Sequence, residues 1–432
     1  MGTARDIGLI QAELERITPI LKENAKSTKL LSAIAWPLEV EERFFADEAS
    51  QLPEVRYEVD RDAAAERIRV LQALAATIDA EHDIANWLKS TVQSFIDGNR
   101  LLLALGTREF YTISLEVYGG ASTESWESGR QNLDLAEHIA ARLEGFHYDE
   151  AQDVSGVPLS DEQFARAIQL RVAAREPRMD IDVQLAPRLT AKIQAGRTRV
   201  RIRNGATFQP WELDNLWSHE VETHALCAQN GALQPRAGFL AAGGPRSTRT
   251  QEGLATFAEL YDHDLGSTRM SQLAQRVKLV AMAESGASFL DIYRHSLARG
   301  VSERDAYFNA QRVCRGGLVS GGAPFTKDVV YLSGLLEVYA FLSTVVRAGS
   351  RDEAEMLVCG RVSLDDMPAL VRLRHLGLLQ RPQFLPRWLV NWRGLLPYFA
   401  FTSFAGLLDM SAVEKKWRRV IDLVESENTR GS

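Results

Sequence analysis

The run HEVETH at residues 219–224 contains the residue types that a catalytic zinc site needs. Zinc binds imidazole nitrogens and carboxylate oxygens, and a catalytic zinc keeps one position for water. In the usual helical motif, H-E-x-x-H, the histidines lie one turn apart and the glutamate is the base. His219 and His224 are one residue further apart, so a regular helix would point their side chains in different directions. We therefore predict a π-helical or irregular turn between them, a feature that is frequent at functional sites.

The pattern alone is weak evidence for a metal site. Because the chain has eight histidines, the pattern would arise by chance in roughly one such chain in a hundred. However, Glu220 and His224 share a stripe with Leu213, Leu216 and Trp217, which is the spacing of a buried helix face. An unpaired carboxylate on a buried face is costly, so Glu220 is better explained as a catalytic base.

The segment TQEGLA at residues 250–255 provides a candidate third ligand. Glu252 follows His224 by 28 residues, which leaves room for a loop and a returning helix. Taken alone, a residue such as Glu252 is more often a carboxylate that favours the start of a helix. Cys227 is the nearest alternative ligand, and its simpler interpretation is a small buried residue.

Two further polar residues follow on the same face of that second helix. Glu259 and His263 come seven and eleven residues after Glu252, so they are candidates for groups that orient the metal ligands. The alternative is an exposed charged face with a polar helix end, and the sequence leaves both interpretations open.

The segment before the HEVETH run is predicted to form a small sheet. Ile181, Val183 and Leu185 alternate with polar residues, and so do Val200 and Ile202. Alternation of this kind is typical of half-buried strands. We therefore predict two strands directly before the zinc-binding helix.

The rest of the chain is predicted to be mainly helical. Pro210 suits the start of a helix and Asn230-Gly231 suits its end, which predicts a helix over about 210 to 229. A second helix is predicted from Thr250 to Asp262. Residues 1 to 100 also have apolar residues at three- and four-residue spacing, which indicates helices.

Length and composition describe a globular chain of several parts. A chain of 432 residues is too long for one ordinary core, and we predict three regions. These are an N-terminal helical region (1–100), a catalytic domain (101–345) and a C-terminal helical region (346–432). The chain is 45% hydrophobic and 25% charged, as globular proteins are.

The charge argues against some partners. A net charge of -7 argues against nucleic acid as the main partner, since phosphate binding needs a basic surface. It also disfavours a strongly acidic partner, unless the fold creates a local basic patch. The apolar run from Phe399 to Leu408 is too short to span a membrane, so no membrane partner is expected.

The expected location is the cytoplasm. The amino terminus has neither the basic segment nor the apolar stretch of a signal peptide. The three cysteines are odd in number and far apart, so they imply no disulfide framework.

The paired motifs HEVETH and TQEGLA resemble a known family, the bacterial flavohaemoglobin expression-modulating QEGLA-motif proteins. They are also similar to the eukaryotic relatives of that family, the microtubule-associated tyrosine carboxypeptidases. Two more blocks carry the resemblance, Gly106 to Gly119 and Arg312 to Gly334. Together the ordered blocks cover about residues 50 to 345.

The resemblance implies a zinc peptidase with one zinc ion per chain. Its ligands would be His219, His224 and Glu252, and Glu220 would be the catalyst. The implied fold is α+β and mainly α-helical, with a small mixed or antiparallel sheet before the zinc-binding helix, as in gluzincin peptidases. The implied reaction is removal of a C-terminal residue, which the eukaryotic relatives carry out on the C-terminal tyrosine of tubulin.

The partner implied for this chain is the C-terminus of a peptide or protein. Tubulin itself is disfavoured, because the chain is acidic and has no long basic extension suited to an acidic tubulin tail. The edge of a strand at 197–203 could align an extended peptide through main-chain hydrogen bonds.

A carboxypeptidase must also bind the substrate's terminal carboxylate, for which arginine is the best donor and lysine the next. Arg315, Lys327 and Tyr331 are the candidates in the third block. The alternative role of Arg315 and Lys327 is a structural ion pair with Asp328 or another acid.

Two other functions remain open. The first is a non-catalytic, zinc-containing regulator that affects gene expression, as the name of the bacterial family suggests. Glu220 argues against it, because a structural zinc site needs no acid beside its first ligand and usually has four protein ligands. The second is a helical interaction scaffold, which would make the whole constellation accidental.

Overall fold

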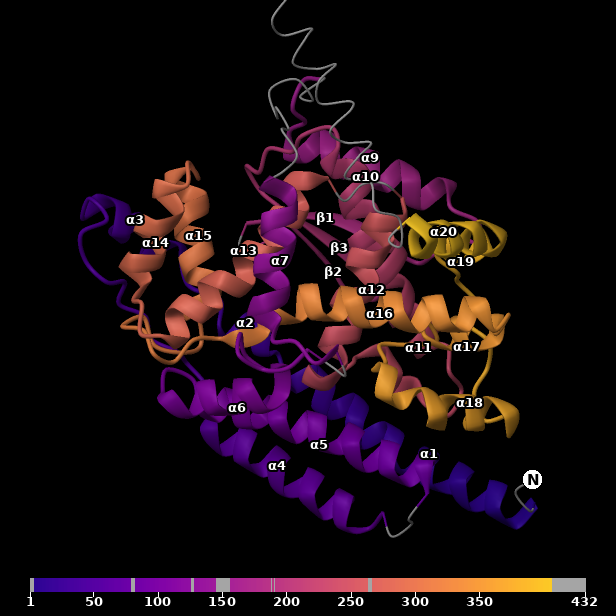
Figure 1. The fold of residues 1–432 in the computed structure, drawn as a ribbon. Helices are drawn as coiled ribbons and strands as arrows, with labels where there is room; N and C mark the ends of the chain where they lie inside the picture. Colours follow the sequence, from indigo (N-terminus) through magenta and orange to yellow (C-terminus); the bar gives the residue numbers. More distant parts are fainter. Residues whose placement is uncertain are drawn as a thin grey trace, which may run out of the picture.

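The computed structural model describes residues 4–78, 82–125, 128–144, 156–187, 189, 191–262 and 266–405. The described chain is mainly helical, with one small three-stranded sheet (Figure 1). The predicted α+β class, mainly helical with a small sheet before the helix that carries His219 and His224, is confirmed. The helices before the sheet are α1 (Ala4–Ser27), α2 (Leu30–Ala33), α3 (Leu38–Ala46), α4 (Arg61–Ala76), α5 (Asp83–Leu103), α6 (Arg108–Tyr118), α7 (Asn132–Glu144) and α9 (Asp161–Ala174).

The helices after the sheet include the site and the C-terminal part. They are α10 (Glu212–Leu216), the π-helix η2 (Trp217–Ala225), α11 (Leu226–Ala232), η3 (Gly238–Ala241), η4 (Pro245–Ser247), α12 (Thr248–Tyr261), α13 (Ser267–Glu284), α14 (Phe289–Ala298), α15 (Glu303–Cys314), η5 (Thr326–Val329), α16 (Val330–Arg347), α17 (Arg351–Met356), η6 (Leu364–Asp366), α18 (Met367–His375), α19 (Arg387–Val390) and α20 (Trp392–Ala405).

The N-terminal hundred residues form helices, as the apolar spacing predicts. Leu14 and Ile17 of α1 are fully buried, so the three-residue spacing marks the face that packs inward. Asp60 caps α4 by accepting a hydrogen bond from the Ala63 amide, which satisfies one free donor of the first turn. In Figure 1, α1, α4, α5 and α6 lie together along one side of the molecule.

The sheet has three strands in the order β1-β3-β2. β1 (Asp182–Ala186) pairs parallel with β3 (Arg199–Arg203), and β2 (Ile193–Ala195) pairs antiparallel with β3, so the sheet is mixed. Val200 and Ile202 are fully buried, as their alternation predicts. β2 is an addition to the two predicted strands, because three residues are too few to show alternation.

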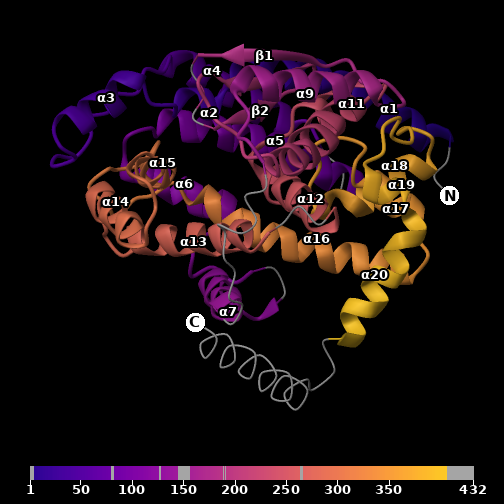
Figure 2. The ribbon, with the colours of Figure 1, turned by 90° about the horizontal axis from the view of Figure 1, so that it is seen from above.

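Packing around the sheet is continuous. One apolar core extends from Leu14 to Phe399 and includes Val200 of the sheet and Val221 of η2. A second core joins residues between Ile34 and Leu332. Figure 2 shows the sheet on one side of the molecule and α7 and α20 on the other, with α12, α13 and α16 between them. The division into three regions stays a prediction, since the first core includes residues of all three.

Two glycines let α12 and α16 cross at very short range. A Cβ atom added to Gly253 would lie 2.2 Å from the carbonyl oxygen of Gly334, so neither position has room for a side chain. The stretch 326–347 is long and apolar enough to cross a membrane by length and composition. Its apolar window is 56% buried inside the molecule, and this packing explains the apolar composition.

Candidate metal centre

His219 and His224 lie on the π-helix η2, which interrupts the helix between α10 and α11. A π-helix pairs residues five apart, so side chains at this spacing return to the same side. The two imidazole rings accordingly lie 4.9 Å apart, measured between their centroids. The predicted irregular turn is therefore confirmed, and it is a π-helix of nine residues.

The predicted end of this helix was wrong by a few residues. The helix continues through Asn230-Gly231 to Ala232. Asn230 is buried, and its side-chain amide donates to the carbonyl oxygens of Val358 and Phe384. These long-range contacts hold the asparagine inside the helix, and the sequence gives no sign of them.

Glu252, in the second turn of α12, faces the two histidines. Its Oε2 atom lies 3.5 Å from His219 Nε2 and 3.6 Å from His224 Nε2. The same oxygen is buried and has no hydrogen-bond partner, whereas Oε1 accepts from Lys327 at 2.7 Å. Burial alone would raise the pKa of Glu252, but Lys327 and the two imidazoles hold it well below its usual value. The carboxylate is therefore charged and directs one free oxygen at both rings.

These three residues fit a single metal ion. Their ligand atoms lie within 4.8 Å of one another, and no other group of three or more histidine, cysteine or acidic residues does so in the described chain. Two ligands at about 2.1 Å from a tetrahedral zinc ion lie about 3.4 Å apart, which matches the separations of Glu252 Oε2 from both imidazoles. Cys227 is buried outside this group, so three protein ligands leave one position free for water.

Glu259 holds His219 from behind. Its side chain is fully buried, and Oε1 lies 2.5 Å from His219 Nδ1, so the Nε2 atom is left facing Glu252. Arg269 donates to both carboxylate oxygens, and Asn215 donates to Oε2. Burial would raise the pKa of Glu259, but Arg269 and His219 lower it, so the carboxylate stays charged. Glu259 is thus buried and bonded rather than part of an exposed face, whereas His263 lies outside the described residues.

The surroundings of His219 favour a positive charge at this ring. Burial would lower its pKa, but the adjacent carboxylates of Glu252 and Glu259 raise it to about 10. Either a proton or a metal cation at Nε2 satisfies the same negative surroundings.

Glu220 extends from η2 to the sheet. Its Oε2 atom accepts a hydrogen bond of 2.7 Å from the backbone amide of Ala195 in β2. The prediction that the strand at 197–203 offers the free edge was wrong. β3 (Arg199–Arg203) is the central strand and is paired on both sides, so β2 is the edge beside Glu220.

The three candidates for substrate binding all lie close to the site, but they differ in their bonding partners. Lys327 is 7% exposed and forms an ion pair with Glu252 instead of Asp328. The Tyr331 hydroxyl accepts a hydrogen bond of 3.2 Å from Lys327. Arg315 is also 7% exposed, and its buried Nε atom has no hydrogen-bond partner. The acid that the sequence suggested as a partner, Asp328, is bound instead by both ends of the Arg312 fork.

Several residues of the site lack any signal in the sequence. Arg269 follows Glu259 by ten residues and Arg276 approaches the Tyr331 ring at 4.6 Å, yet both belong to the plain helix α13. Arg361 comes from the far C-terminal part and donates to the carbonyl oxygen of His224 at 3.4 Å. Only the folded chain brings these arginines to the site.

A basic groove of about 570 Å³ lies beside Glu220. Its wall includes Ala195, whose amide binds Glu220, and Arg361, which contacts His224. Six of the thirteen residues in the wall are basic and none is acidic. The basic residues are Lys26, Lys29, Arg197, Arg199, Arg201 and Arg361.

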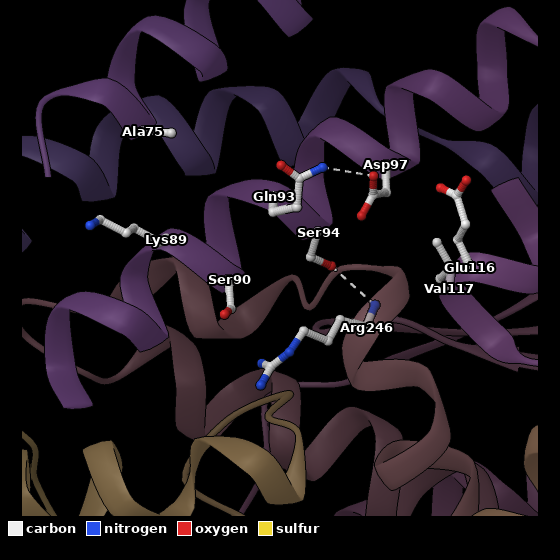
Figure 3. A pocket seen from close by; sticks show the side chains of 9 residues that line it. All are labelled: Ala75, Lys89, Ser90, Gln93, Ser94, Asp97, Glu116, Val117 and Arg246. Carbon is white, nitrogen blue, oxygen red and sulfur yellow. Dashed lines mark hydrogen bonds between the residues drawn. The ribbon is translucent and has the colours of Figure 1, made fainter. Parts of the chain in front are cut away.

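A second hollow of about 470 Å³ lies between α5, α6 and η4 (Figure 3). It mixes basic residues, Lys89 and Arg246, with acidic ones, Asp97 and Glu116. Within it, Ser94 accepts a hydrogen bond from the Arg246 amide. None of the three candidate metal ligands lines this hollow, so it is separate from the candidate metal centre.

Two packed helices that direct two imidazoles and a carboxylate to one point define the kind of centre that helical metallopeptidases use. The chain belongs to the microtubule-associated tyrosine carboxypeptidase family, whose model matches residues 42–406. At the level of the family it is therefore a carboxypeptidase-like peptidase. The likeness to the bacterial QEGLA-motif proteins stays a prediction.

Among solved structures, Trypanosoma cruzi metallocarboxypeptidase 1 is similar over 89% of this chain and 95% of that chain. The sequence identity is 12% and the TM-score is 0.37, and so loose a likeness carries no conclusion for this chain. None of the curated proteins matches the chain in sequence.

Proposed function

We propose that this chain is a zinc-dependent carboxypeptidase that removes the C-terminal residue of a peptide or protein. The observation that carries the proposal is the buried, unpartnered Oε2 atom of Glu252, which faces the Nε2 atoms of His219 and His224. These three residues would hold the zinc ion. When bound, zinc would supply a Lewis acid that polarises the scissile carbonyl and acidifies a water molecule.

Glu220 is the proposed proton carrier of the reaction. It leaves the same turn of η2 as His219, and it takes a proton from the attacking water and delivers it to the departing amine. The hydrogen bond from the Ala195 amide fixes the carboxylate beside the sheet edge. Main-chain groups of β2 that do not pair with β3 would align the substrate as an added strand.

The basic groove favours an acidic substrate segment. The overall charge of -7 disfavours an acidic partner, but the charges beside Glu220 have the opposite sign. Six basic side chains with no acid among them would attract a peptide rich in aspartate and glutamate. We therefore propose that the natural substrate is an acidic C-terminal tail, which brings tubulin-like tails back into consideration.

Arg315 is the proposed receptor for the substrate's terminal carboxylate. Lys327 is already bound to Glu252, where it balances the charge of that ligand. Arg315 has a buried donor with no partner, and a guanidinium fork binds carboxylates well. Burial and Glu252 would raise the pKa of Tyr331, but the opposing effect of Lys327, Arg312 and Arg276 is larger, so the pKa lies below its usual value. The hydroxyl is therefore a stronger hydrogen-bond donor to the substrate.

The test compares the native protein with Glu220→Gln. Both are loaded with zinc and incubated with peptides of varied C-terminal residues, and mass spectrometry follows the loss of single residues. We expect the native protein to release one C-terminal residue and Glu220→Gln to bind zinc but lose at least about a hundredfold in kcat. The control is Glu116→Gln, an exposed carboxylate on α6. Equal cleavage by Glu220→Gln would remove this residue from its role, and no cleavage by the native protein would contradict the proposed function.

A further inference from the structure

Five basic side chains gather around Tyr331 and Glu252. The centroid of the Tyr331 ring lies 4.6 Å from Cζ of Arg276, 5.9 Å from Cζ of Arg312 and 4.7 Å from Nζ of Lys327. Arg269 and Arg315 complete the cluster.

Three of these five bases have a carboxylate partner. Arg269 is paired with Glu259, Arg312 with Asp328 and Lys327 with Glu252. Arg276 and Arg315 form no ion pair with any carboxylate in the part of the chain that the structure describes. The cluster therefore has two guanidinium groups without a carboxylate partner of their own.

The two unmatched guanidinium groups also have free donors. The Nη1 atom of Arg276 and the Nε atom of Arg315 are buried without a hydrogen-bond partner. Burial and the nearby Arg312 lower the pKa of both groups to about 10. Buried donors and charges of this kind are costly unless a ligand satisfies them.

This inference rests on the proposed function, in which Arg315 receives the terminal carboxylate of the substrate. One carboxylate neutralises one guanidinium, and Arg276 is then still unmatched. We propose that Arg276 receives a second carboxylate, the side chain of a C-terminal glutamate or aspartate, and so selects acidic C-terminal residues. Arg276 comes from α13 and lies over the Tyr331 ring, whereas Arg315 follows α15 and lies over the Phe325 ring. The two guanidinium groups therefore come from different helices and can bind two separate carboxylates.

A C-terminal tyrosine would satisfy the cluster less well. Its ring could stack on Arg276, but it brings no charge to neutralise a second buried guanidinium. Glutamate and glutamine have the same shape and differ in one charge, so the comparison between them isolates the proposed role of Arg276.

The test measures binding to the zinc-loaded Glu220→Gln variant, which separates recognition from cleavage. Four labelled peptides share one sequence and end in glutamate, glutamine, tyrosine or amidated glutamate. By fluorescence anisotropy, we expect the glutamate peptide to bind about tenfold or more tighter than the glutamine peptide. With Arg276→Gln added, this ratio should fall to about one, and with Arg276→Lys, which keeps the charge, part of it should remain. The control is Arg381→Gln, which breaks a surface ion pair with Asp352 and should keep the ratio.

Three results would overturn the inference: a glutamate-to-glutamine ratio near one, a ratio that Arg276→Gln leaves unchanged, or tighter binding of the tyrosine peptide. Cleavage by the native protein distinguishes this failure from failure of the proposed function. Release of tyrosine in preference to glutamate contradicts the inference and leaves the carboxypeptidase intact. No release from any peptide contradicts both.

Discussion

Glu252 divides its carboxylate between two tasks. One oxygen binds Lys327, and the other faces the two imidazoles without a hydrogen bond. The lysine offsets the cost of a buried carboxylate, and the free oxygen keeps the geometry of a ligand. On the opposite side, Glu259 and Arg269 fix the ring of His219 in one orientation. Glu252 and His219 are therefore each held by paired charges, as supporting groups around a metal site would be.

Glu259 should control metal affinity without touching the metal. Glu259→Gln weakens the acceptor at His219 Nδ1 and the ion pair to Arg269, so we expect zinc affinity to fall about 10–100-fold. Competition with a chromogenic chelator measures this affinity. The matched control is Glu355→Gln, which removes a buried glutamate paired with Arg351 on α17. Equal zinc affinity in Glu259→Gln and native protein would show that the hydrogen bond does not position the ligand.

The pair of Arg312 and Asp328 should contribute to stability in a pH-dependent way. Arg312→Met leaves Asp328 buried and unpaired, so the free energy of unfolding should fall by about 3–5 kcal/mol at neutral pH. Burial would raise the pKa of Asp328, but Arg312 lowers it below its usual value. The contribution of this carboxyl is therefore complete above its unfolded pKa of about 3.9 and declines as the pH falls below that value.

Urea unfolding of the native protein and Arg312→Met at pH 7 and pH 3 measures the effect. The difference in the free energy of unfolding between the two proteins should be smaller at pH 3 than at pH 7. A larger difference at pH 3 would contradict the assigned charges.

At the scale of elements, the site depends on two departures from regular packing. The π-helix η2 returns His219 and His224 to one side, and the crossing of Gly253 with Gly334 brings α12 against α16. The second feature explains the glycine of the QEGLA motif, because it places Glu252 within reach of Lys327. The motif thus combines a candidate metal ligand with the glycine that lets its helix approach.

Gly253→Ala should therefore damage both packing and metal binding. The added methyl group would meet the backbone of Gly334, so α12 must shift, and we expect a loss of about 1–3 kcal/mol in the free energy of unfolding. Zinc affinity should fall as well, because Glu252 is the neighbouring residue. Thermal unfolding and zinc titration measure the two effects. The control is Gly8→Ala in α1, where an added Cβ atom would have no neighbouring atom within 4 Å. If Gly253→Ala were as harmless as Gly8→Ala, the tight crossing of α12 and α16 would be contradicted.

The elements show how far the sequence predicts the site. Residue spacing predicts the irregular turn between His219 and His224, because only that turn lets both bind one ion. It also places Glu252 on a returning helix. The sequence does not reveal β2, whose three residues are too short for a pattern, and so it misplaces the strand edge beside Glu220. Arg276 is also missed, because its role arises from contacts between helices far apart in the chain.

At the scale of the whole molecule, charge is unevenly distributed. The chain has a net charge of -7, yet the groove beside Glu220 contains six basic side chains and no acid. Composition gives only the sum, and the fold determines where each sign gathers. The acidic remainder of the surface disfavours binding of acidic chains elsewhere, which would direct them to the groove.

The groove should make cleavage of acidic peptides sensitive to salt. Raising the ionic strength from about 0.01 M to 0.15 M shortens the screening length from about 30 Å to 8 Å, so kcat/KM for an acidic peptide should fall several-fold. A neutral peptide should change little. Arg197→Glu should reduce cleavage of the acidic peptide, whereas Arg69→Glu on the exposed face of α4 should not. The same salt dependence for both peptides would contradict a steering role for the groove.

The central claim is that His219, His224 and Glu252 hold one zinc ion, and metal content tests it most directly. Native protein, His224→Ala, Glu252→Gln and a control, His375→Ala on the exposed side of α18, are loaded with zinc and dialysed. Elemental analysis then gives zinc per chain, and thermal unfolding reports the stability that bound metal adds. We predict one zinc ion per chain and a raised Tm for the native protein and His375→Ala, and loss of both in the other two variants. A native protein without zinc, or variants that retain it, would contradict the account.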